Sequence, residues 1–277
     1  MNYNASTVVK TAKELLDSRG ITHYNDTIFL LEKILNRPCS VLENIELNEQ
    51  QYSDYMSLIH RRAEHEPMDS LMGYTEFLGL IIPFSVDTLS PRQETEIMID
   101  SIIKENKNRS NLKVLDLCSG SGCIGLAIAK HLSAKVTLVD VSPEALAVAK
   151  KNSQLNNIDV EIIKSNLFEN IKEKFDIIIT NPPYIPSADC LKLEKEVKDY
   201  DPLLALDGGF DGLDIIRKII KIAPDYLKKD GLIYMEYGIG QSEDIRVLFE
   251  PYYDNIEIVK DYSGIDRYIK GRKRDLC

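Results

Sequence analysis

From residue 112 onward, short apolar strands alternate with helices, and this alternation constrains the fold more than any other feature. The strands are KVLDL, KVTLVD, VEIIK, FDIIIT, GLIYMEY and NIEIVKD, and helices are predicted near Gly122, Pro143, Gly212 and Gln241. Strands joined through a helix run parallel, and a parallel sheet needs helices on both faces. We therefore predict an α/β region whose last strands, about 254–260 and 266–271, form an antiparallel hairpin at the sheet edge.

Residues 1–72 instead show a helical pattern. STVVKTAKELLDSRG offers Ser6 as N-cap and Gly20 as a stop, and NDTIFLLEKILNRP and NEQQYSDYMSLIHRRAEHEP repeat the amphipathic spacing. YTEFLGLIIPFSVD then predicts a β-hairpin, and SPRQETEIMIDSIIKEN predicts a helix with Ser90 as N-cap and Pro91 at its first position. We expect three parts, which are a helical domain over 1–72, a hairpin linker over 73–90 and an α/β domain over 91–277.

Composition argues against several classes of function. The 277 residues include 34 Lys+Arg and 44 Asp+Glu, and the net charge of −10 repels the phosphates of nucleic acids on average. The five cysteines are scattered and odd in number, so we predict neither a disulfide framework nor a metal site. No signal-peptide pattern and no membrane-spanning apolar stretch is present, so we expect a cytoplasmic protein that does not enter a membrane.

A glycine-rich turn joins the first predicted strand to its helix, in VLDLCSGSGCIGLAIAK. Gly120 and Gly122 let the backbone approach a ligand closely, and ligands of such sheets lie beyond the strand C-termini. Asp140 ends the next strand, where a carboxylate accepts from both ribose hydroxyls; the alternative is that it only begins the turn before Pro143. The letters GSGCIG fit a dinucleotide fingerprint as well as an S-adenosylmethionine loop, so this motif alone does not separate the two cofactors.

The strand FDIIIT runs directly into TNPPY, and this tip favours methyl transfer over hydride transfer. Methylation of a planar amide or amino nitrogen needs acceptors for two N–H groups and a flat surface beside them. The side-chain carbonyl of Asn181 and the backbone carbonyl of Pro182 are such acceptors, since neither proline has an N–H. Pro182 and Pro183 also stiffen the turn before a substrate arrives, and Tyr184 offers a ring for stacking.

The third predicted strand ends in KSNLFEN. Asn166 could hydrogen-bond the exocyclic amine of an adenine, and Leu167 could pack on the face of its ring. The alternative is a plain turn with Leu167 and Phe168 in the core.

NPPY together with the upstream DLCSGSG and VD resembles the class I S-adenosylmethionine-dependent N-methyltransferases. Five further segments narrow the resemblance to the release-factor glutamine N5-methyltransferase family: GYTEFLGL, LSPRQETE, DPLLALDGGFDGL, MEYGIGQ and DYSGIDR. This family methylates the side-chain amide of the glutamine in the Gly-Gly-Gln loop of bacterial class I peptide-chain release factors. The resemblance implies a Rossmann-like, seven-stranded class I methyltransferase fold with a C-terminal antiparallel hairpin, and an N-terminal helical bundle that recognises the substrate.

The resemblance also implies roles for individual residues. S-adenosylmethionine, which leaves as S-adenosylhomocysteine, is held by Cys118, Ser119, Gly120, Ser121, Gly122, Asp140, Asn166, Leu167 and Asn181. The substrate glutamine is held by Asn181, Pro182, Pro183, Tyr184, Arg92 and Glu94, of which Asn181, Pro182 and Tyr184 are the catalytic set. Arg92 and Glu94 have an alternative as an ion pair at the start of a helix. Glu236, at a later strand end, is assigned no role.

The chain departs from the family pattern at four positions, none of them in NPPY. Gln93 stands where a proline is usual, and Cys118 stands where a glycine is usual. Asp201 replaces a glutamate, and Asn166 replaces an acidic residue.

Two other functions compete with this interpretation. A nucleic-acid methyltransferase acting on adenine N6 or guanine N2 uses the same tip, but the net charge of −10 and the lack of a target-recognition domain oppose it. A helical adaptor with a vestigial cofactor fold is opposed by the intact NPPY and by Asp140. We expect a monomer whose partners are release factors and which does not bind nucleic acid directly.

Overall fold

The structure, a computed structural model, describes residues 2–23 and 25–275 and divides the chain into two compact units. The first comprises Met1–Tyr74 with Glu194–Tyr200, and the second comprises Thr75–Leu193 with Asp201–Cys277. The assignment of substrate recognition to residues 1–72 stays a prediction. No helix in the described ranges is long and apolar enough to cross a membrane.

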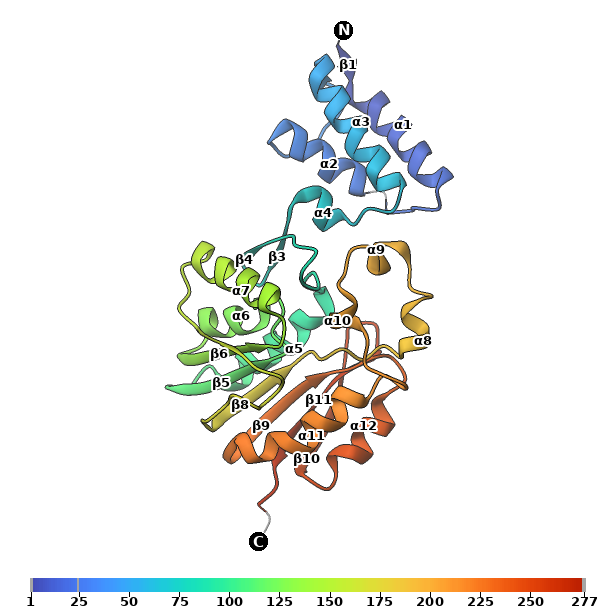
Figure 1. The fold of residues 1–277 in the computed structure, drawn as a ribbon. Helices are drawn as coiled ribbons and strands as arrows, with labels where there is room; N and C mark the ends of the chain where they lie inside the picture. Colours follow the sequence, from blue (N-terminus) through green and yellow to red (C-terminus); the bar gives the residue numbers. More distant parts are fainter. Residues whose placement is uncertain (1, 24, 276–277) are drawn as a thin grey trace. The chain divides into compact units, whose positions relative to one another are not determined.

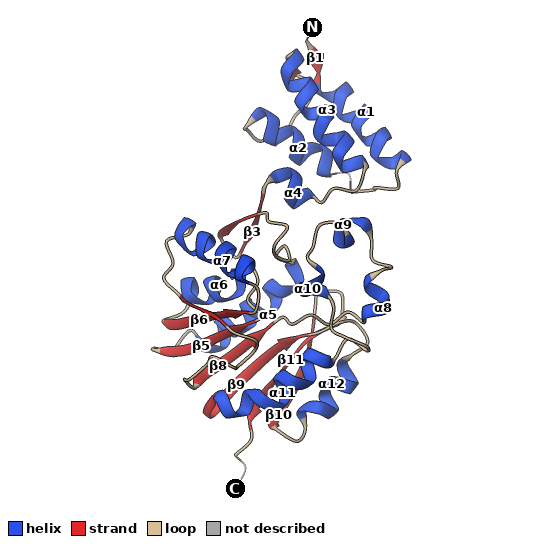
Figure 2. Ribbon diagram, viewed as in Figure 1, coloured by secondary structure: helices blue, strands red, loops and turns tan. Residues whose placement is uncertain are grey.

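A seven-stranded mixed sheet forms the centre of the second unit (Figure 2), with strand order β10-β11-β9-β8-β5-β6-β7. The strands are β5 Leu112–Leu117, β6 Ala134–Asp140, β7 Glu161–Lys164, β8 Phe175–Thr180, β9 Leu227–Glu236, β10 Tyr253–Lys260 and β11 Asp266–Lys273. β9, β8, β5, β6 and β7 are paired in parallel, whereas β11 is antiparallel to both β9 and β10. The predicted parallel sheet with an antiparallel hairpin at its edge is confirmed.

Helices cover both faces of this sheet (Figure 1). α5 Gln93–Asn106, α6 Cys123–His131 and α7 Pro143–Leu155 share one apolar cluster, and α11 Asp214–Tyr226 and α12 Ser242–Phe249 share the other. β8 shows why its sequence is apolar throughout. Ile177 and Ile179 are buried in the first cluster and Ile178 in the second, so neither face of the strand is exposed.

The segment before α5 differs from the prediction. The hairpin is present as β3 Tyr74–Phe77 and β4 Leu80–Pro83, but Ser90 does not cap the following helix. The N-cap residue of α5 is Arg92, without a side-chain cap. Ser90 is buried, and its backbone N–H donates to Asp201 Oδ1 at 3.4 Å, so a tertiary contact keeps this stretch outside the helix. Four short helices were not predicted, namely α4 Met68–Met72, α8 Ser187–Cys190, α9 Lys195–Lys198 and α10 Leu203–Leu206.

The first unit is a small bundle around its own apolar core. Its helices are α1 Ala5–Ser18, α2 Asn25–Leu35, α3 Glu49–Ala63, α4 Met68–Met72 and α9 Lys195–Lys198. The prediction of Ser6 as N-cap of α1 is wrong, because the side chain of Asn4 accepts the hydrogen bond from the Thr7 N–H. Asparagine is as good a cap as serine, so local preference could not choose between the two. A pair of two-residue strands, β1 Tyr3–Asn4 and β2 Glu46–Leu47, was also missed.

Arg62 holds α9 within this bundle through buried ion pairs. Its Nε donates to Asp26 Oδ2 at 2.7 Å, and its Nη1 donates to Glu196 Oε1 at 2.7 Å. Nη1 also donates to the Glu66 carbonyl at 3.1 Å. Because the Arg62 and Asp26 side chains are only 2% and 10% exposed, removal of Arg62 would leave the Asp26 carboxylate with little water to replace its partner.

We expect Arg62→Ala to lower the free energy of unfolding of the helical unit by about 3–5 kcal/mol, the cost of breaking a buried pair by removing one partner. Urea denaturation followed by circular dichroism measures this change. Arg19→Ala is the matched control, because Arg19 pairs with Glu64 at an exposed site where such pairs contribute less than about 1 kcal/mol. Equal effects of the two substitutions would contradict the structural role of Arg62.

Candidate active site

A cavity of about 330 Å³ lies at the carboxyl ends of the parallel strands. Its wall includes residues that end or follow β5, β6, β7 and β8, namely Cys118, Asp140, Asn166 and Asn181. The chain order reverses here, because β6 lies on one side of β5 and β8 on the other. Crevices at such a reversal are the usual ligand sites of doubly wound sheets.

Most of the residues predicted for the site line this cavity. They are Arg92, Cys118, Ser119, Gly120, Ser121, Asp140, Asn166, Leu167, Asn181 and Pro183. Gly122, Pro182, Tyr184 and Glu94 do not line it. Gly122 lies between α6, α7 and the sheet instead, since a Cβ there would come within 2.9 Å of Leu138 and 3.1 Å of Ala149.

The turn after β5 is held in an unusual backbone conformation. Cys118 has a φ of 60°, a left-handed value that costs a non-glycine residue roughly 1–2 kcal/mol. This conformation accounts for the usual glycine at this position of the family pattern. Gly120 has a φ of 52°, and a Cβ there would meet no atom within 4 Å, so the turn has open space beside it at this residue.

Asp140 holds this turn and also faces the cavity. Its Oδ2 accepts from the Gly120 N–H at 2.8 Å, and its Oδ1 accepts from the Ser142 N–H at 2.9 Å. The sequence left open whether Asp140 faces a ligand or only begins the turn before α7. In the structure its carboxylate begins that turn and is also part of the cavity wall. Each oxygen retains acceptor capacity, so the site fits a ligand with ribose hydroxyls.

The turn after β7 separates two neighbouring apolar side chains. Leu167 lies on the cavity wall, whereas Phe168 is buried and stacks on Tyr226 with ring centroids 4.7 Å apart. The side-chain amide of Asn166 donates to Glu169 at 2.9 Å. An adenine contact by Asn166 stays a prediction.

Asn181 is oriented from behind by two buried polar residues. Its Nδ2 lies 3.5 Å from Thr95 Oγ1, and Thr95 Oγ1 donates to Glu236 Oε2 at 2.7 Å. The Asn181 amide also hydrogen-bonds the Glu236 carboxyl. Since these contacts take the N–H side of the amide, the carbonyl oxygen of Asn181 is the atom that remains for the cavity. Within residues 25–275, no backbone N–H donates to the Pro182 carbonyl.

Sequence reasoning missed Thr95 and gave Glu236 no role. Burial raises the pKa of Glu236 to about 7. The hydrogen bond from Thr95 lowers this pKa, and the nearby Glu94 carboxylate raises it. The position of Glu236 in the sequence could have indicated a place near Asn181, because Glu236 ends β9, and β9 lies next to β8 and parallel to it.

Arg92 and Glu94 have ion-pair partners other than each other. Arg92 Nη2 contacts Asp201 Oδ2 at 2.5 Å, and Glu94 Oε1 lies 3.6 Å from Arg267 Nη2. Arg92 therefore ties the start of α5 to the segment before α10 at the cavity wall. Among the residues described, no cluster of three or more His, Cys, Asp or Glu is arranged to hold a metal ion.

This fold and site define a class I S-adenosylmethionine-dependent methyltransferase. Residues 84–194 match the family model described as Methyltransferase small domain. A methyltransferase from Pyrococcus furiosus has a similar fold, with a TM-score of 0.53 and 19% identity, over 70% of this chain and 89% of that one. The T. thermophilus 16S rRNA N2 G1207 methyltransferase, solved with AdoMet and guanosine, gives a TM-score of 0.54 and 17% identity, over 73% of this chain and 50% of that one.

Curated relatives narrow the class to one family. The release factor glutamine methyltransferase of Geobacter sulfurreducens is 39% identical over 229 residues, which is 82% of this chain and 80% of that protein. The protein of the same name from Flavobacterium psychrophilum is 38% identical over 271 residues, or 95% of each chain. The chain therefore belongs to the release factor glutamine methyltransferase family, as the sequence motifs predicted, and it is an enzyme that uses S-adenosylmethionine.

The raised pKa of Glu236 predicts a pH dependence of stability. The carboxyl keeps its proton in the folded protein up to about pH 7, whereas in the unfolded chain it ionises near its ordinary value of 4.5. The contribution of Glu236 therefore falls as the pH rises through this window, because the folded state binds more protons.

We expect Glu236→Gln to gain stability relative to the wild type as the pH rises from 4.5 to 8, because glutamine keeps an acceptor for Thr95 and does not ionise. Thermal unfolding across this range measures the difference, with the exposed Glu250→Gln as control. A difference in Tm that does not change with pH would show that Glu236 is already ionised in the folded protein.

Proposed function

We propose that this enzyme methylates the side-chain amide nitrogen, N5, of the glutamine in the Gly-Gly-Gln motif of class I peptide-chain release factors. The orientation of the Asn181 amide carries the proposal. Thr95 and Glu236 take its N–H side, which leaves its oxygen for the cavity. The Pro182 carbonyl is the next along the chain and accepts from no backbone N–H of residues 25–275, although Pro182 is not part of the cavity wall. Two fixed oxygen acceptors suit the two N–H groups of a primary carboxamide.

The cavity residues support binding of S-adenosylmethionine, which supplies an electrophilic methyl group on a sulfonium sulfur when bound. Asp140 would accept from the ribose hydroxyls, and the turn of residues 118–122 would lie along the cofactor. Leu167 would present an apolar surface to the adenine, beside Asn166. These residues follow three neighbouring strands, so a single ligand can reach all of them.

An amide nitrogen is a weak nucleophile because its lone pair is delocalised into the carbonyl. Asn181 Oδ1 and the Pro182 carbonyl would each accept one N–H of the substrate glutamine and fix its plane. Positive charge develops on the nitrogen as its bond to the methyl carbon would form and the bond from that carbon to sulfur would break. These oxygens then bind the N–H groups more strongly than in the ground state, and the nitrogen would afterwards release one proton to water. Pro182 and Pro183 keep the turn stiff, so little reorganisation is needed when the substrate binds.

The proposed setting is the cytoplasm, where release factors act in translation. We propose that the enzyme works as a monomer, that residues 1–72 contact the release factor, and that it does not bind nucleic acid directly. The net charge of −10 supports the last point.

Incubation of release factors with the enzyme and S-adenosylmethionine, followed by mass spectrometry, tests the reaction. We expect one added methyl group, located on the glutamine of the Gly-Gly-Gln motif. Tritium transfer from labelled cofactor to purified release factor, duplex DNA and ribosomal RNA separates this function from nucleic-acid methylation. Label on DNA or RNA alone would reject the proposal.

Asp140→Ala is expected to weaken S-adenosylmethionine binding by about 10-fold or more, because hydrogen bonds to a charged carboxylate contribute about 1.5–3 kcal/mol each. Isothermal titration calorimetry gives the Kd directly. Asp159→Ala removes a carboxylate from an exposed position between α7 and β7 and serves as control. An unchanged Kd for Asp140→Ala would remove Asp140 from the cofactor site.

Asn181→Ala is expected to lower kcat by about 10²-fold or more, the effect of losing one preorganised polar group at a developing charge. The exposed Asn108→Ala is the control, and steady-state methyl transfer to a release factor is the assay. A loss of only a few-fold would be inconsistent with Asn181 as an acceptor for the reacting amide.

A further inference from the structure

Two family motifs have no role in the reaction as proposed above, yet both contact the backbone just after Asn181. DPLLALDGGFDGL supplies hydrogen bonds to Ile185, the residue after Tyr184. The Ile185 N–H donates to the Leu206 carbonyl at 3.0 Å, and the Gly208 N–H donates to the Ile185 carbonyl at 2.8 Å. The chain after NPPY is therefore paired with this segment on both its donor and its acceptor side.

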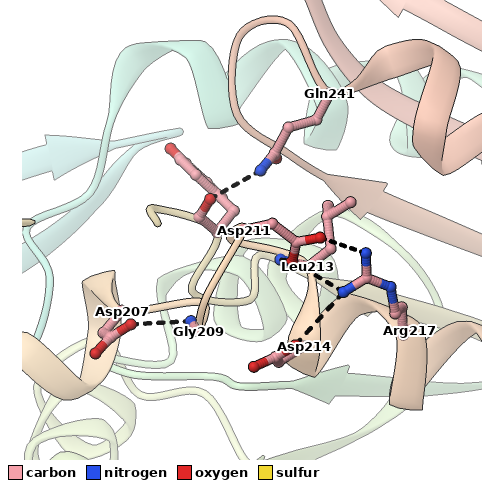
Figure 3. Close-up of polar contacts among 8 residues, drawn as sticks. Asp207, Gly209, Asp211, Leu213, Asp214, Arg217 and Gln241 are labelled. Carbon is pink, nitrogen blue, oxygen red and sulfur yellow. Dashed lines mark hydrogen bonds and ion pairs between the residues drawn. The ribbon is translucent and has the colours of Figure 1, made fainter. Parts of the chain in front are cut away.

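MEYGIGQ supplies the second contact, through the side chain of Gln241 (Figure 3). Gln241 Nε2 donates to the Tyr184 carbonyl at 2.9 Å, while its Oε1 accepts from the Gly238 N–H at 2.8 Å. Both ends of the side-chain amide are thus engaged, so its orientation is determined. Gln241 directly precedes α12, which lies in the same apolar cluster as α11 and gives the glutamine a rigid support.

Glycines allow these segments to approach the Tyr184 backbone closely. A Cβ at Gly208 would lie 2.8 Å from both the Pro183 oxygen and the Tyr184 Cα. A Cβ at Gly212 would lie 2.2 Å from the Tyr184 oxygen and 2.7 Å from Gln241 Nε2. Any larger residue at either position would displace the Tyr184 backbone, which follows the proposed acceptors Asn181 and Pro182 in the chain.

Ion pairs and turns fix the glycine segment itself. Asp207 Oδ1 accepts from the Gly209 N–H at 2.9 Å (Figure 3). Arg217 on α11 donates to both carboxylate oxygens of Asp211, at 2.9 and 2.5 Å. The surface that contacts Tyr184 is therefore anchored to a helix of the sheet's apolar cluster.

We propose that Gln241 is a positioning residue for methyl transfer, and that Gly208 and Gly212 provide the surface against which it holds the Tyr184 peptide. This inference rests on the proposed function. The Pro182 carbonyl lies two residues before that peptide in a turn with two prolines, so a displaced Tyr184 peptide moves the acceptor. A misplacement of about 1 Å costs on the order of 10²-fold in rate. Apart from Asn181, the proposed cofactor residues follow other strands, so we expect cofactor affinity to depend little on Gln241.

Gln241→Glu tests the inference, because a carboxylate still accepts from Gly238 but cannot donate to the Tyr184 carbonyl. We expect kcat for release-factor methylation to fall by about 10-fold or more, with the Kd for S-adenosylmethionine within about two-fold of the wild type. Gln154→Glu makes the same chemical change at an exposed position of α7, and both constants should stay at wild-type values.

Gly212→Ala and Gly264→Ala form a second matched pair. Both glycines have a φ of 79°, so alanine strains the backbone equally, but a Cβ at Gly264 meets no atom within 4 Å. We expect a loss of kcat only for Gly212→Ala, at a temperature where both variants are folded. If Gly212→Ala does not fold, the Gln241 pair still decides the question.

The outcomes separate this inference from the proposed function. An active wild type with unchanged kcat in Gln241→Glu overturns the positioning role. A wild type that binds S-adenosylmethionine but methylates no release factor overturns the proposed function. Hydrogen exchange then tests Gln241 without substrate: faster exchange of the Ile185 and Gly208 amides in Gln241→Glu supports the contact, and unchanged exchange rejects it.

Discussion

The carboxyl ends of parallel strands meet at one edge of a sheet, and the whole site depends on this constraint. The strand order places the ends of β6 and β8 on either side of the end of β5, so Asp140 and Asn181 face one cavity although 40 residues lie between them in the sequence. Each strand end delivers one polar group, and the sheet's apolar core fixes their spacing. In the proposed reaction, the cofactor and the reacting amide would therefore meet without any long flexible side chain.

Asn181 needs support from behind, because an amide at a strand tip can present either its oxygen or its nitrogen. Thr95 from α5 and Glu236 from β9 settle this choice by taking the N–H side. The cost is a carboxyl group in an apolar environment, and this cost appears as the raised pKa of Glu236. Three residues after Asn181, the side chain of Gln241 donates a hydrogen bond to the Tyr184 carbonyl. Elements far apart in the sequence thus converge on four residues of backbone.

Each unit buries a titratable side chain whose partners decide its favoured form. Arg62 in the helical bundle and Glu236 in the methyltransferase unit are both nearly inaccessible, yet one is a charge held by carboxylates and the other is favoured in its neutral form. The difference follows from the partners. Arg62 has two carboxylates and a carbonyl within hydrogen-bond distance. At Glu236, burial and the charge of Glu94 raise the pKa by more than the bonds from Thr95 and Asn181 and the charge of Arg267 lower it.

The sequence alone determined the order of the seven sheet strands and the longer helices, the glycine turn, the acidic end of β6 and the Asn-Pro-Pro-Tyr tip, because each is a local pattern of periodicity or backbone geometry. Ser6 and Ser90 failed as helix caps because caps are chosen by contacts as well as by propensity: Asn4 serves α1, and Asp201 binds the Ser90 N–H. Only the tertiary structure placed Thr95, Glu236 and Gln241 behind Asn181 and Tyr184, since their contacts span 57 to 141 residues of sequence. Periodicity can tell which side of a strand is buried, but it cannot tell which distant side chain will be its neighbour.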